Sequence, residues 1–118
     1  MAGGDVAEFR ERMNDALKDA LRARDSNSIA AFRSALGAIA NAEAVEPGTD
    51  RALKPKLGIG VGDVERRSLS LYELIEIVNG EVEEHMQGAG EYENLGRTDA
   101  ANALRAQAAA LVRFLRGD

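Results

Sequence analysis

The chain has 118 residues, a formal net charge of −5, no cysteine and only 4% aromatic residues. The absence of cysteine excludes disulfides, thiolate metal sites and a cysteine nucleophile. This length predicts a single domain over residues 1–118 with a modest core, and the scarcity of aromatic side chains favours helix-on-helix packing over a sheet.

The first predicted element is an amphipathic helix from about residue 5 to residue 24. Asp5 followed by Glu8 resembles a capping box, so we expect this helix to begin at Asp5. Apolar residues recur there at three- and four-residue steps, which places them on one helix face: Val6, Phe9, Met13, Ala16, Leu17 and Ala20.

A second helix is predicted to begin near Ser26 or Asn27, which are both favourable N-cap residues. Gly37 lies inside it at a cost of about 1 kcal/mol relative to alanine, and we expect close approach of another helix there. Pro47 and Gly48 are predicted to end the segment. The apolar face of this helix consists of Ile29, Phe32, Leu36, Ile39 and Ala40.

Residues 46–69 are predicted to form one long loop, because they contain two prolines and four glycines. A connection of this length inside a compact domain is generally functional or disordered. The glycines at 58, 60 and 62 match neither common phosphate-loop spacing, so we interpret them as part of a flexible linker.

The third helix is predicted to follow Ser70, because Ser70 and Glu73 form a second capping box. Asn79-Gly80 is also a hairpin signal, but no alternating strand follows it, so we favour a continuous helix. Gly88 and Gly90 make the later turns of this helix uncertain. Gly96 is the expected stop, and Thr98 is the expected cap of a fourth helix. The complete prediction is an all-α bundle of about four amphipathic helices.

No residue cluster predicts a catalytic, metal or cofactor site. His85 is the only histidine, and a zinc site with one histidine and no cysteine would be atypical. We interpret His85 as a solvated surface residue. A standalone enzyme is therefore the least favoured of the functions considered.

Charge is unevenly distributed along the chain. Residues 63–93 contain nine acidic residues and only Arg66 and Arg67 as cations. A solvated helix face accounts for such a pattern, and a docking surface for a basic partner is the alternative; its candidates are Glu81, Glu83 and Glu84. The candidates for nucleic-acid binding are Arg22, Arg24, Arg33, Arg66, Arg67 and Arg97, although an acidic protein is atypical of that function.

Three stretches resemble the YqeY-like family, relatives of the tail region of the GatB subunit of tRNA-dependent amidotransferases: LKDALRARD at 17–25, RSALGAIANAEAV at 33–45 and EYENLGR at 91–97. A fourth, VGDVERRSLS at 61–70, resembles a linker of short members of the family. The resemblance implies a helical bundle in a short form without the second small helical domain of longer members. It implies no catalytic residue.

The resemblance also implies a function, namely an accessory module associated with glutamine-dependent amidotransferase systems. It would bind tRNA or a translation-associated protein through the basic end of the first helix and the long loop. The competing hypothesis is a protein-interaction module with an acidic docking face on the third helix. We expect a cytoplasmic protein, because neither an export signal nor a membrane-spanning run is evident.

Overall fold

A computed structural model of the chain describes residues 2–44 and 68–118, and within them it contains four helices: α1 (Ala2–Ala23), α2 (Ser26–Glu43), α4 (Leu71–Asn94) and α5 (Thr98–Arg116). They form a small all-α bundle, which confirms the predicted fold class. None of these helices combines the length and apolar content that crossing a membrane requires.

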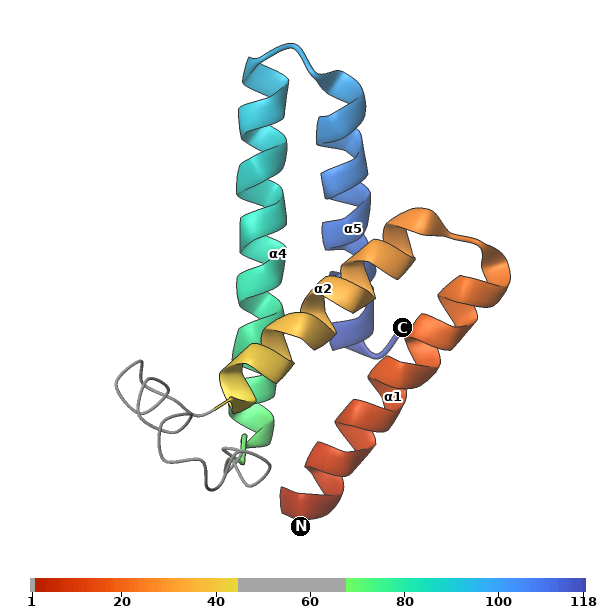
Figure 1. The fold of residues 1–118 in the computed structure, drawn as a ribbon, viewed down its shortest axis with the longest axis vertical. Coiled ribbons are helices and arrows are strands. Elements are labelled where there is room, and N and C mark those ends of the chain that lie inside the picture. Colours follow the sequence, from red (N-terminus) through yellow and green to blue (C-terminus); the bar gives the residue numbers. More distant parts are fainter. Residues whose placement is uncertain (1, 45–67) are drawn as a thin grey trace, which may run out of the picture.

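The helices are arranged as two pairs (Figure 1). α4 and α5 form a long antiparallel hairpin, which is the most extensive helix pair in the molecule. α1 and α2 form a second, more open pair that packs against the lower part of this hairpin (Figure 1). The turn between α4 and α5 therefore projects beyond α1 and α2.

The start of α4 agrees with the sequence prediction. Ser70 Oγ accepts from the Glu73 backbone N–H at 3.1 Å, and the Glu73 carboxylate accepts from the Ser70 N–H at 2.9 Å. Asn79 and Gly80 lie inside the helix, so the hairpin alternative is wrong. Gly88 and Gly90 are helical as well, because helix-on-helix packing outweighs their low intrinsic propensity.

α2 begins at Ser26, as predicted, but three of the predicted N-caps are wrong. α1 begins at Ala2, so Asp5 lies in its first turn, where a negative charge is favourable. The N-cap of α2 is Asp25, whose carboxylate accepts from the Ser28 N–H at 3.2 Å and the Ser28 hydroxyl at 2.7 Å. Thr98 is already helical, because the tight turn from α4 places Arg97 at the N-cap of α5 without a side-chain cap.

Three helices end with the same backbone closure, in which a residue with positive φ reverses the chain. At the end of α4, Gly96 has a φ of 77°. The Gly96 N–H donates to the Glu93 carbonyl oxygen, and the Arg97 N–H donates to the Tyr92 carbonyl oxygen at 2.8 Å. This is the Schellman arrangement, and it confirms Gly96 as the stop.

The same closure follows α1 and α5. Gly117 has a φ of 84° after α5, and Arg24 has a φ of 57° after α1. Arg24 is the only described non-glycine residue with positive φ, and such a conformation is costly for a residue with a Cβ atom.

Phe114 of α5 lies at the centre of the core. Its ring centre is 5.2 Å from that of Phe9 on α1 and 6.1 Å from that of Phe32 on α2, in edge-to-face arrangements that are favourable between aromatic rings. Leu111 and Leu74 are fully buried nearby. The core therefore joins all four helices.

The close helix approach lies at Gly88 and not at Gly37 as predicted. A Cβ atom on Gly88 would lie 3.0 Å from Leu104 Cδ1 of α5, whereas one on Gly37 would meet nothing within 4 Å. At Gly88, α4 and α5 are therefore so close that an added side chain would displace Leu104.

The predicted 46–69 loop is described only at its end, where Leu69 is buried in the core. Leu69 therefore packs in the core just before α4 begins and is not part of a flexible linker. Residues 46–67, including Pro47, Gly48, Arg66 and Arg67, lie outside the described residues. α2 ends before Pro47 and Gly48, with Ala44 as its C-cap.

Candidate functional site

The four predicted nucleic-acid-binding arginines that the structure describes lie on different elements of the fold. Arg22 and Arg24 lie at the end of α1, whereas Arg97 lies in the α4–α5 turn, which projects beyond α1 and α2 (Figure 1). Arg33 is exposed on α2. Arg66 and Arg67 lie outside the described residues.

Two of these arginines already have partners within the chain. Arg22 forms an exposed ion pair with Asp19 at 2.9 Å, and Arg97 lies 5.7 Å from the centre of the Tyr92 ring. An exposed arginine can exchange such contacts for a phosphate at little cost, because surface ion pairs are weak. The spacing between the arginines therefore matters more than their present partners.

The three predicted docking glutamates divide between two environments. Glu81 is half-buried and accepts a hydrogen bond from the Ser34 hydroxyl of α2. Glu83 and Glu84 are exposed. Glu81 therefore links α4 to α2, and an exposed acidic surface on α4 must consist of other glutamates.

An acidic stripe runs along the outer face of α4. Helical periodicity places residues seven or eight apart on the same face, and four exposed glutamates follow these steps. We name them the α4 stripe: Glu76, Glu83, Glu84 and Glu91. α4 contains neither lysine nor arginine, so no cation of the same helix interrupts the stripe.

His85 is half-buried and not fully solvated as predicted. Its Nδ1 lies 2.6 Å from the Glu81 carbonyl oxygen, one turn earlier in α4. This contact fixes the ring along the helix. Within residues 2–44 and 68–118, no group of three or more histidine, aspartate or glutamate side chains could bind a metal ion.

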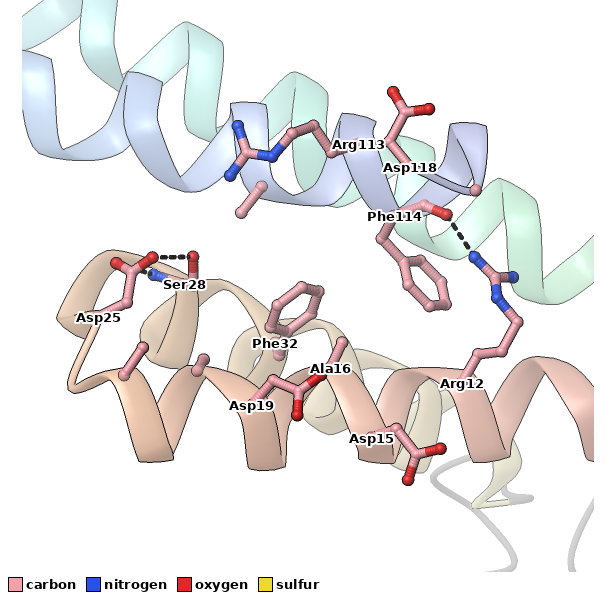
Figure 2. A pocket seen from close by; sticks show the side chains of 14 residues that line it. Arg12, Asp15, Ala16, Asp19, Asp25, Ser28, Phe32, Arg113, Phe114 and Asp118 are labelled. Atoms are coloured by element: carbon pink, nitrogen blue, oxygen red, sulfur yellow. Dashed lines mark hydrogen bonds between the residues drawn. The ribbon is translucent and has the colours of Figure 1, made fainter.

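A cleft of about 450 Å³ lies between α1, the start of α2 and the end of α5 (Figure 2). The Phe32 and Phe114 rings lie between the helices, and charged side chains surround them (Figure 2). Four aspartates and two arginines line the cleft: Asp15, Asp19, Asp25, Asp118, Arg12 and Arg113.

Several of these charged groups make contacts that support the fold. Arg12 donates to the Phe114 carbonyl oxygen at 2.7 Å. The hydrogen bond from the Ser28 hydroxyl is the largest cause of the lowered pKa of Asp25, followed by that from the Ser28 N–H; the Arg113 charge is a smaller cause. The cleft is therefore mainly a junction between helices.

A second depression, of about 550 Å³, lies on α4 and α5 alone. We name it the hairpin groove; it is lined by Val82, Met86, Arg105, Ala108, Ala109, Val112, Arg113 and Arg116. Its arginines were not among the residues predicted from the sequence. Finding them requires the register between α4 and α5, which the spacing within each helix does not specify.

Comparisons with known proteins identify no relative of this chain. No protein-family model matches the chain, and neither a curated protein nor a solved structure matches it significantly. The function is therefore inferred from the surfaces described above.

Proposed function

We propose that this protein is a non-catalytic accessory module that binds a basic, translation-associated protein through the α4 stripe. The stripe is the observation that carries the proposal, because it places four exposed glutamates on a helix without cations. A surface whose charges all have one sign attracts partners of opposite charge and raises their rate of association.

The projection of the α4–α5 hairpin supports this assignment. α1 and α2 pack against the lower part of the hairpin (Figure 1), so the upper half of α4 is accessible to a large partner. α4 has 24 residues and is about 36 Å long at 1.5 Å per residue. A surface of this length suits a macromolecule better than a small ligand. The translation link rests on the resemblance to the YqeY-like family.

The test compares two variants of equal charge. Glu83→Gln with Glu84→Gln neutralises the middle of the stripe, and Glu8→Gln with Glu11→Gln neutralises two exposed residues of α1. Each protein serves as bait in nuclease-treated cytosol at low and high salt. We expect the wild type and the α1 variant to capture a basic protein, which high salt releases. The stripe variant should capture several-fold less of the same protein. Equal capture by both variants would contradict the proposal.

Binding of tRNA is the competing function implied by the same resemblance. The net charge of −5 and the separation of Arg22 and Arg24 from Arg97 argue against it, because phosphate contacts supply most of the affinity for nucleic acids. Filter binding of tRNA at low salt distinguishes the two functions. If tRNA is the partner, Arg22→Gln with Arg24→Gln weakens binding and the stripe variant strengthens it.

A further inference from the structure

The hairpin groove is an apolar surface that the rest of the described chain leaves uncovered. All of its lining residues belong to α4 and α5, and none belongs to α1 or α2. Met86 is 48% exposed at its edge. Exposed apolar surface between two helices is typical of a docking site for a further helix.

The shape of the groove suits a helical occupant. Ala109 is exposed in it, and such a small side chain lets the backbone of another helix approach closely; Ala108 forms the buried floor of the groove at 2% exposure. Met86 lies opposite them on α4, and methionine adapts its flexible side chain to different partners. The groove can therefore accept a row of leucine-sized side chains.

The charges that line the hairpin groove indicate which kind of helix it would bind. Arg105, Arg113 and Arg116 line it together with the apolar residues, and no acidic side chain does. Arg105 also forms an ion pair with Glu93, and Arg113 also lines the cleft that contains Asp25 and Asp118; the charged side chains that line the groove itself are all positive. This is opposite in sign to the α4 stripe and to the whole chain.

We propose that the hairpin groove binds an amphipathic helix of a partner protein whose apolar stripe is flanked by acidic side chains. The apolar stripe would pack on Met86, Ala109 and Val112, and the flanking carboxylates would pair with the three arginines. This surface is separate from the α4 stripe, so the hairpin would contact an acidic element on one side and a basic one on the other.

The test uses two synthetic helical peptides with the same leucine stripe, one flanked by glutamate and the other by lysine. Fluorescence anisotropy at low salt measures their binding to the full chain. We expect the glutamate peptide to bind about tenfold more tightly, since three exposed ion pairs contribute modestly. Ala109→Glu should abolish this binding, and Ala30→Glu on the exposed face of α2 should not, with circular dichroism confirming that both variants are folded.

Three outcomes would overturn the proposal. The first is equal or tighter binding of the lysine peptide, and the second is no saturable binding of the glutamate peptide. The third is sedimentation of the chain as a dimer that Ala109→Glu converts to a monomer, because a second copy would then occupy the groove. The glutamine variants of the α4 stripe leave the groove intact, so failure here is distinguishable from failure of the proposed function.

Discussion

The Arg12 guanidinium on α1 donates to the carbonyl oxygen of Phe114 on α5 at 2.7 Å and lies 4.4 Å from the centre of the ring of the same residue. One side chain thus contacts both the backbone and the ring of the central core residue. The last carbonyl groups of a helix lack N–H donors inside the helix itself, and the Phe114 carbonyl oxygen accepts both from the Gly117 N–H at 3.1 Å and from Arg12. Arg12 therefore ties α1 to α5.

We expect Arg12→Ala to lower the free energy of unfolding by about 1–3 kcal/mol, because it removes a charge-assisted hydrogen bond and a cation–π contact. Arg22→Ala is the matched control, since the pair of Arg22 with Asp19 is exposed and should contribute about 0.5 kcal/mol or less. Urea unfolding measures both values. Equal losses in the two variants would show that Arg12 is an ordinary surface residue.

Gly88 and Gly80 should respond differently to alanine. Gly80→Ala is expected to stabilise the protein by up to about 1 kcal/mol through higher helix propensity, because no atom lies within 4 Å of the added Cβ. Gly88→Ala brings its Cβ to 3.0 Å from Leu104, so the Leu104 side chain must move and most of the gain is lost. Thermal melts that rank Gly88→Ala above Gly80→Ala would contradict the close helix approach.

Arg24→Gly should stabilise the protein even though it adds a flexible residue. The left-handed conformation of Arg24 costs a residue with a Cβ atom about 1–2 kcal/mol. Glycine avoids this cost, but its greater freedom in the unfolded chain lowers the free energy of unfolding by about 0.5–1 kcal/mol. The expected net gain is up to about 1 kcal/mol. Lys18→Gly in the interior of α1 is the control, and it should destabilise by about 1 kcal/mol. Destabilisation by both variants would refute the strain at Arg24.

Asp25 should make stability depend on pH. Its pKa is lowered in the folded protein, first by the Ser28 hydroxyl and then by the Ser28 N–H. The resulting stabilisation is fully present above the unfolded value of about 3.9 and is lost as the pH falls through the lower folded-state value. Asp25→Asn keeps a capping side chain without the charge.

The difference in melting temperature between wild type and Asp25→Asn is therefore expected at neutral pH and should vanish in strong acid. Ser28→Ala should raise the pKa of Asp25, which NMR titration of the carboxyl carbon measures directly. An unchanged titration in Ser28→Ala would rule out the hydroxyl as the main cause.

Features that depend on neighbouring residues were predictable from the sequence. The Ser70–Glu73 capping box and the stop at Gly96 each involve residues within one or two turns, so their spacing alone identifies them. The cap of α2 was missed because Asp25, Ser26 and Asn27 are all good caps. The left-handed turn at Arg24 makes Asp25 the cap, and an arginine gives no sequence signal for that conformation.

The surfaces were only partly predictable. The acidity of α4 is evident from its sequence, and the spacing of Glu81 from Leu74 and Val78 already places it near the packed face. The hairpin groove was not predictable, because Met86 and Ala109 lie in separate helices. Their proximity depends on the α4–α5 register, which the tertiary packing of the two helices determines.

The short turn between α4 and α5 also has a consequence for how the protein folds. Only Leu95, Gly96 and Arg97 separate the two helices, so closing the hairpin loses little chain entropy. The most extensive helix pair is thus also the one most local in sequence, and such contacts form fastest. We expect the hairpin to be the folding nucleus, with α1 and α2 docking afterwards. Substitutions at the α4–α5 contact should then slow folding, whereas those of Arg12 should mainly accelerate unfolding.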